Sequence, residues 1–136
     1  MAYLLDTNIL SELQKGEKAH KGVRAWFAGV DGEDCFLSVL VIGELHQGIQ
    51  RLQRRDATQA AHLSNRLQTL ESTFADRILP VTLPIAKRWA ENNVPNPLPV
   101  IDGFLAATAQ EHELVLVTRN VRDVAPSGVS VLNPFE

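Results

Sequence analysis

Short apolar runs that stop abruptly at polar residues recur along the chain. Residues 3–5 form such a run and stop at Asp6, and the run at residues 114–117 stops in the same way at Thr118. Apolar runs of this length, bounded by residues that favour turns and helix caps, predict buried strands. Further strands are predicted at residues 35–38, 78–82 and 129–132. The chain therefore alternates strands with helical segments, which is typical of an α/β fold.

Apolar residues spaced three and four apart predict the helices between these strands. The segment from Val39 to about Leu52 has such a stripe, with Ser38 placed to cap the helix and Glu44 on the flank of the stripe. Other helices are predicted at residues 9–14, 18–30, 56–76, 84–92 and 100–113. The helices at 39–52 and 56–76 are expected to form an antiparallel hairpin that projects from the sheet.

Two glycines lie inside the predicted helix at residues 39–52. Gly43 and Gly48 are near Glu44 in the sequence. Glycine lowers helix stability, so its presence there indicates a close approach of backbone or of a ligand.

The helix predicted at residues 100–113 carries an acid on its apolar face. Asp102 precedes Leu105, Ala106 and Ala109 by three, four and seven residues, which places its side chain in the middle of the packing face. An isolated buried charge is so costly that a carboxylate there is paired, neutralised or bound to a metal. The alternative is that Asp102 only caps its helix, because the helix dipole favours an acid in the first turn.

Four acids occupy comparable places in this pattern. Asp6 and Asp123 follow strands, Glu44 lies on a helix flank and Asp102 on an inward helix face. Taken alone, Asp6 also fits an ordinary helix cap. Four carboxylates brought together would repel one another unless a cation lay among them, and an all-oxygen site favours Mg²⁺ or Mn²⁺. Such a site activates water for phosphodiester hydrolysis. That the four acids converge is a hypothesis, since spacing along the chain does not measure their distances.

Composition and charge fit one globular domain spanning residues 1–136. The chain is 45% apolar and 21% charged, with a net charge of −3. The negative charge argues against non-specific binding of nucleic acid, which is normally a property of basic domains. An RNA partner would therefore need local basic groups. The candidates are residues 15–24 and the arginines at 51, 54 and 55, which equally fit a solvated helix end.

The expected cellular compartment and the expected chemistry of the cysteine follow from features that the sequence does not have. Its start does not have the pattern of a signal peptide, and no apolar run is long enough to cross a membrane, so a soluble cytoplasmic protein is expected. Cys35 is the only cysteine, which excludes an internal disulfide, and its apolar neighbours place it in the core. The four histidines show no zinc-type spacing.

Four segments of the chain resemble the PIN-domain ribonucleases, and within them the VapC-type toxins of bacterial toxin–antitoxin pairs, especially the FitB-like branch. They are LLDTNIL around Asp6, the segment from Ser38 to Glu44 that ends in GEL, VIDGFLAATA around Asp102, and LVTRNVRD ending at Asp123. Each is modest alone, but all four in this order are specific. The similarity covers nearly the whole chain.

The resemblance implies a PIN-like three-layer α/β/α fold with a central parallel five-stranded sheet. It also implies a metal-dependent endoribonuclease whose acidic site takes Mg²⁺ or Mn²⁺. The acids that match the family's metal-binding and catalytic residues are Asp6, Glu44, Asp102 and Asp123. The residues expected to orient acids, water or phosphate are Asn8, Thr118 and Asn120. One departure is Val124, where many relatives have Phe; it is expected to alter local packing.

The resemblance further implies partners. These are a cognate antitoxin that occupies the active-site groove, a second copy of the chain in a homodimer, and a structured RNA substrate such as transfer RNA. The main alternative is a catalytically silent PIN-like module that binds a protein or RNA, but the chain retains all four acids. A receiver-like domain phosphorylated on Asp would need a Lys near a late strand, where this chain has Arg119. No glycine-rich phosphate loop or dinucleotide fingerprint is present.

Overall fold

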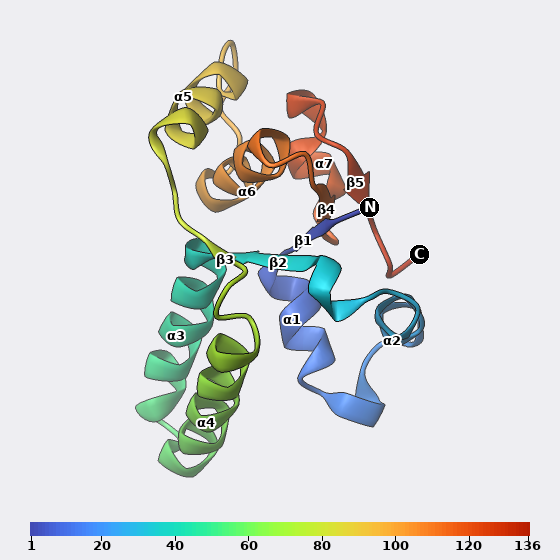
Figure 1. Cartoon of the computed structure of the whole chain (residues 1–136). Helices are drawn as coiled ribbons and strands as arrows, with labels where there is room; N and C mark the ends of the chain where they lie inside the picture. The colour runs from blue at the N-terminus through green and yellow to red at the C-terminus, as the bar shows by residue number, and fades with distance from the viewer.

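The computed structural model describes all 136 residues and places a parallel sheet between two layers of helices (Figure 1). The strands are β1 (Tyr3–Leu5), β2 (Cys35–Ser38), β3 (Ile78–Leu79), β4 (Val115–Val117) and β5 (Val131–Leu132). Their order across the sheet is β3-β2-β1-β4-β5, and every neighbouring pair is parallel. The expected α/β fold with a central parallel five-stranded sheet is confirmed.

Seven α-helices connect and cover these strands. They are α1 (Thr7–Leu13), α2 (Lys21–Ala28), α3 (Val39–Gln53), α4 (Ala57–Thr73), α5 (Leu83–Asn92), α6 (Val100–Glu111) and α7 (Val121–Val124). Figure 1 shows α5 and α6 on one side of the sheet and α1, α3 and α4 on the other. The pair α3 and α4 extends beyond the sheet as the projecting hairpin that the sequence predicts. None of the helices combines the length and the apolar character needed to cross a membrane.

Two of these helices begin directly at the end of a strand, because the connecting residue caps them. The Asp6 carboxylate accepts a hydrogen bond from the Thr7 backbone N–H at 2.6 Å, which starts α1. Ser38 Oγ accepts one from the Leu40 N–H at 3.1 Å, which starts α3. A side-chain oxygen in this position satisfies an N–H group that has no partner inside the helix. The first turns of α1 and α3 are thereby fixed at the same edge of the sheet.

Some predicted boundaries are wrong. The helix expected at residues 18–30 begins only at Lys21, because residues 16–18 form a 3₁₀ turn and Ala19 is extended. The strand expected at residues 78–82 ends at Leu79, since Pro80 has no N–H to donate to a neighbouring strand. The strand expected at residues 129–132 is formed only by Val131–Leu132.

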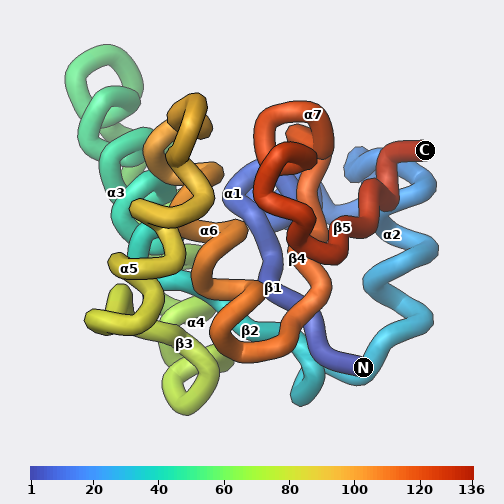
Figure 2. The backbone as a smooth tube through the Cα atoms, turned by 90° about the horizontal axis from the view of Figure 1, so that it is seen from above, coloured from blue at the N-terminus to red at the C-terminus, as the bar shows by residue number.

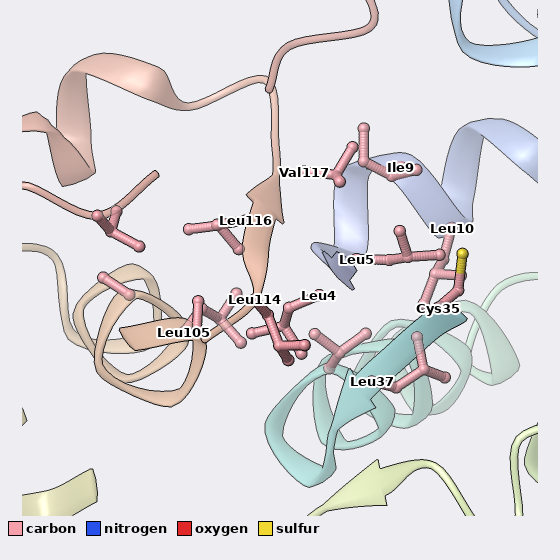
Figure 3. Packing of buried hydrophobic residues seen from close by; sticks show 14 of the residues in the cluster. Leu4, Leu5, Ile9, Leu10, Cys35, Leu37, Leu105, Leu114, Leu116 and Val117 are labelled. Carbon is pink, nitrogen blue, oxygen red and sulfur yellow. The ribbon is translucent and has the colours of Figure 1, made fainter. Parts of the chain in front are cut away.

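The main core lies between the sheet and the helices that flank β1 and β4. It contains 17 buried residues, among them Leu4 and Leu116 from these strands and Leu105 from α6 (Figure 3). Cys35 is fully buried in this core, as expected, and burial raises the pKa of its thiol to about 11. A smaller cluster joins the two helices of the hairpin; it consists of Ile49, Ala60 and Leu67.

A glycine allows α5 to approach α6 closely. A Cβ atom at Gly103 would lie 3.2 Å from Cδ1 of Trp89, tighter than an ordinary contact. The Trp89 ring stacks on Phe104 with 4.6 Å between centroids and an interplanar angle of 3°. This packing fixes the first turn of α6, and with it the backbone of Asp102.

Candidate functional site

The order of strands reverses between β1 and β4, which are neighbours in the sheet although most of the chain separates them in sequence. Leu5 pairs with Val117, and the Asp6 N–H donates to the Val117 carbonyl at 3.0 Å. Asp6 and Thr118 therefore lie side by side just beyond the carboxyl ends of these strands. Ligands of open α/β sheets bind at such a reversal point.

Three donors fix the Asp6 carboxylate in one orientation. Thr118 Oγ1 donates to Oδ2 at 2.7 Å, Asn8 Nδ2 donates to the same atom at 3.1 Å, and the Thr7 N–H donates to Oδ1. Asp6 is only 4% exposed, and burial raises its pKa despite these hydrogen bonds. The structure thus brings together Asp6 and two of the residues that the resemblance assigns to orienting the acids.

Asp102 lies at the centre of the acidic cluster. It occupies the first turn of α6 and is half-buried. Burial raises the pKa of Asp102 to about 6, and the negative charges of Asp6 and Asp123 add to the effect. The nearby Asn120 side chain lowers this pKa, and Glu44 contributes a smaller repulsion that raises it. All four acids singled out in the sequence are therefore close enough to interact electrostatically.

Glu44 reaches the cluster through a contact that sequence spacing did not predict. Thr7 Oγ1 donates to Glu44 Oε1 at 2.5 Å, which ties α3 to the first turn of α1. Thr7 is separated from Glu44 by 37 positions. Only its place directly after the Asp6 cap could have indicated that its side chain faces the site.

Asp123 was predicted to lie just beyond a strand, but in the structure it does not. It lies in α7, a four-residue helix that the sequence pattern did not reveal, and its side chain is exposed. Val124 beside it is buried in the main core, which fixes the helix against the sheet. The Asn120 N–H at the start of α7 donates to Thr118 Oγ1 at 3.0 Å. The residues after β4 thus fold back far enough for the charge of Asp123 to act on Asp102.

The residues of this site fit a hard divalent cation held partly by water. No three His, Cys, Asp or Glu side chains converge tightly enough to form a complete metal-binding cage. Mg²⁺ characteristically binds one or two carboxylates and retains several waters, so a full cage is not required. The clustered charge of Asp6 and Asp102, with only oxygen ligands nearby, matches that preference.

The raised pKa of Asp102 predicts a pH dependence of stability for the metal-free protein. An acid with a folded-state pKa of about 6, against 3.8 in the reference state, binds more protons folded than unfolded between these values. Its stabilising contribution is complete below about pH 4 and is lost as the pH rises through 6. Allowing for solvent screening of this half-exposed group, unfolding should cost about 1 kcal/mol more at pH 5 than at pH 7.5.

Urea unfolding at both pH values, in chelator and in 10 mM Mg²⁺, measures this effect. Asp102→Asn is the control and should lose most of the pH dependence. Bound Mg²⁺ should reverse the trend, since it stabilises the ionised carboxylate. A metal-free protein whose stability rises from pH 5 to pH 7.5 would contradict the raised pKa.

A cavity of about 260 Å³ adjoins the acids between α1 and the hairpin. Its lining combines polar residues, such as Glu44 and Thr7, with apolar ones, such as Ile49 and Leu63. Gly48 also borders it. A Cβ atom at either Gly43 or Gly48 would meet nothing within 4 Å, so the predicted close approach of the chain's own backbone is wrong at both.

The exposed arginines at the end of α3 and the following turn are Arg51, Arg54 and Arg55.

Comparison with known proteins agrees with this fold and places the chain in a family. The toxin FitB of Neisseria gonorrhoeae is 33% identical, with 97% of each chain covered. The VapC ribonuclease Y4jK of Sinorhizobium fredii is 30% identical, covering 98% of this chain and 97% of that protein. The crystal structure of FitAcB from Neisseria gonorrhoeae matches with a TM-score of 0.90 at 32% identity, over 98% of this chain and 99% of that one. Residues 3–123 match the PIN domain, and the chain belongs to the PIN-domain family.

Proposed function

We propose that this protein, a single domain over residues 1–136, is a metal-dependent endoribonuclease and the toxin of a toxin–antitoxin pair. The observation that carries the proposal is the gathering of acids around Asp102 at the reversal point of the sheet. The names of the relatives, a toxin and a VapC ribonuclease, support the same activity. The proposed catalytic and metal-binding residues are Asp6, Glu44, Asp102 and Asp123.

The contacts of the acidic side chains indicate the role of each in RNA hydrolysis. When bound, Mg²⁺ or Mn²⁺ supplies a water of lowered pKa and polarises the phosphoryl oxygens. Asp6 is held ready as a ligand by Thr118 and Asn8, so little reorganisation is needed when the cation binds. Glu44 Oε1 is occupied by Thr7, whereas Oε2 accepts no hydrogen bond from the chain and is free to take a proton from water.

The proposal includes partners and a place of action. Several similar structures are toxin–antitoxin complexes, including one from Klebsiella pneumoniae at 28% identity. A cognate antitoxin that covers the acidic site would keep the enzyme inactive in the cytoplasm, where its RNA substrate is found. We further propose a homodimer and a structured RNA substrate such as transfer RNA.

Cleavage of total bacterial RNA by the purified full chain tests this function. The protein should be unfolded and refolded during purification to remove any bound antitoxin. Discrete RNA fragments that appear with Mg²⁺ or Mn²⁺ and disappear with chelator are expected. Absence of cleavage together with absence of Mn²⁺ binding in calorimetry would overturn the proposal and favour a silent PIN-like binding module.

A further inference from the structure

Arg119 stands between the two residues that hold the central acids of the site. Thr118 donates to Asp6, and the Asn120 side chain lies close enough to Asp102 to lower the pKa of that carboxyl. The Arg119 N–H itself donates to Asn8 Oδ1 at 3.3 Å, so its backbone is tied to the first turn of α1. Arg119 is exposed. The backbone of an exposed cationic residue is thus held next to the residues that contact the acids.

The Arg119 guanidinium is not neutralised by these acids. The ion pairs of the chain involve other basic residues, and Arg119 forms none. Its guanidinium carbon instead lies 4.5 Å from the centroid of the Phe135 ring. The Arg119 side chain takes part in no hydrogen bond or ion pair within the chain, so its five N–H donors remain free. The group is therefore oriented and still able to bind an anion at two points.

The Phe135 ring is itself held in place by α2. Its centroid lies 5.1 Å from that of His20, which caps α2. Pro134 is buried, and its carbonyl lies so close to Gly22 that a Cβ atom there would clash with it. Figures 1 and 2 both place the C-terminus beside α2. The tail is packed rather than loose, so the position of the ring is set by the fold.

We propose that Arg119 binds a phosphate of the RNA backbone beside the acidic site, and that Phe135 positions its guanidinium for this contact. The inference rests on the proposed ribonuclease function. The acids repel a polyanion, and the chain has a net charge of −3, so affinity for RNA must come from local cations. A planar guanidinium with free N–H donors matches phosphate geometry better than a lysine does.

Steady-state cleavage and equilibrium binding of fluorescein-labelled bulk bacterial transfer RNA test the proposal. Binding is measured on full chains that also carry Asp102→Asn, so that the RNA is not cut. Arg119→Gln should raise KM and the dissociation constant about tenfold and reduce the salt slope of binding by about 0.7 to 1. Its kcat and its Mn²⁺ affinity in calorimetry, measured without Asp102→Asn, should change less than about twofold, since the acids are untouched.

Three further variants separate the roles of charge, shape and position. Arg119→Lys keeps the charge and should preserve the salt slope while losing about threefold in affinity. Phe135→Leu keeps apolar packing but not the ring, and should raise KM by about threefold with the salt slope preserved. Lys87→Gln removes an exposed cation of α5 that lies outside the basic groups considered for RNA binding; it is the control and should leave both values unchanged.

Each opposing outcome points to a different error. If Lys87→Gln weakens binding as much as Arg119→Gln does, affinity follows net charge and the assignment is wrong. If Arg119→Gln lowers kcat and Mn²⁺ affinity instead of raising KM, Arg119 only supports the acids. If RNA binding is unchanged but capture of an antitoxin is lost, the residue serves a protein partner. Absence of cleavage by the parent chain would instead refute the ribonuclease function itself.

Discussion

Replacing Asp102 with Asn is expected to abolish divalent-metal binding and RNA cleavage while leaving the fold intact and more stable. Asn keeps the size of the side chain but removes the charge at the centre of the acidic cluster. Loss of a group that stabilises charge in the transition state costs on the order of 10³-fold in rate. The same loss relieves the repulsion with Asp6 and Asp123, so the metal-free variant should gain about 1 kcal/mol at pH 7.5 after screening is allowed for.

Calorimetric titration with Mn²⁺, RNA cleavage and urea unfolding of the variant measure these effects together. Asp34→Asn is the matched control, because Asp34 is exposed and lies just before β2, at the opposite end of the strands from the acids. The control should retain metal binding and cleavage. An Asp102→Asn protein that cuts RNA as the parent does would show that the acidic site is assigned wrongly. One that fails to fold would show that the Asp102 carboxylate is required for the fold itself.

The position of Asp102 was predictable because a helix has a regular period. Its spacing from Leu105, Ala106 and Ala109 places an acid on the packing face, whatever the rest of the fold is. Asp123 was less predictable, since a helix of four residues is too short to show a periodic pattern. The cap roles of Asp6 and Ser38 were visible for a similar reason, because capping is local in sequence.

Long-range contacts explain what the sequence did not reveal. The acids meet only because β1 lies next to β4, and periodicity contains no information on strand order. The resemblance to a known family predicted a parallel five-stranded sheet but not the order of its strands. The contacts of Thr7 with Glu44 and of Arg119 with Phe135 join segments whose positions the strand order determines. Sequence spacing identifies which side chains are available, and the topology determines which of them meet.

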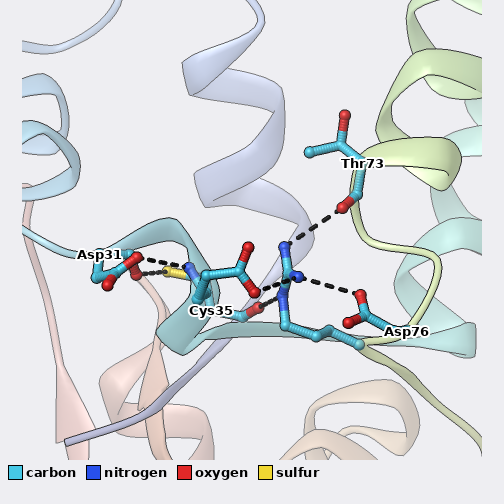
Figure 4. A network of polar contacts seen from close by, with 6 residues as sticks. Asp31, Cys35, Thr73 and Asp76 are labelled. Carbon is cyan, nitrogen blue, oxygen red and sulfur yellow. Dashed lines mark hydrogen bonds and ion pairs between the residues drawn. The ribbon is translucent and has the colours of Figure 1, made fainter.

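Replacing Arg77 with Met is expected to destabilise the protein by about 2–3 kcal/mol without changing metal binding or RNA cleavage. The Arg77 side chain is nearly buried, and Nε donates to the Cys35 carbonyl at 3.0 Å and Nη2 to the Thr73 carbonyl at 3.3 Å. Figure 4 shows this network, in which Asp76 also takes part. The guanidinium lies over the Phe74 ring as well, at 5.0 Å from its centroid. Met retains the aliphatic bulk but leaves both carbonyls without this donor.

The exposed carboxylates of the network contribute little to the expected loss. Glu33 and Asp76 pair with Arg77, but their side chains are 77% and 78% exposed and return to water when it is removed. Arg24→Met is the matched control, because Arg24 is exposed and makes a single hydrogen bond to a carbonyl. It should change the free energy of unfolding by no more than about 0.5 kcal/mol. An unchanged urea midpoint for Arg77→Met would mean that the network does not stabilise the junction of β2, β3 and α4.

Measurements of activity distinguish the role of the Arg77 network from that of the acidic site. Arg77 contacts the first residue of β2 and precedes β3, whereas the acids lie beyond the opposite ends of the strands. Folded Arg77→Met protein should therefore bind Mn²⁺ and cut RNA as the parent does, which assays at 20 °C in the absence of urea would show. Asp102→Asn should behave in the reverse way, losing activity and gaining stability. A loss of activity in folded Arg77→Met protein would mean that the two ends of the sheet are energetically coupled.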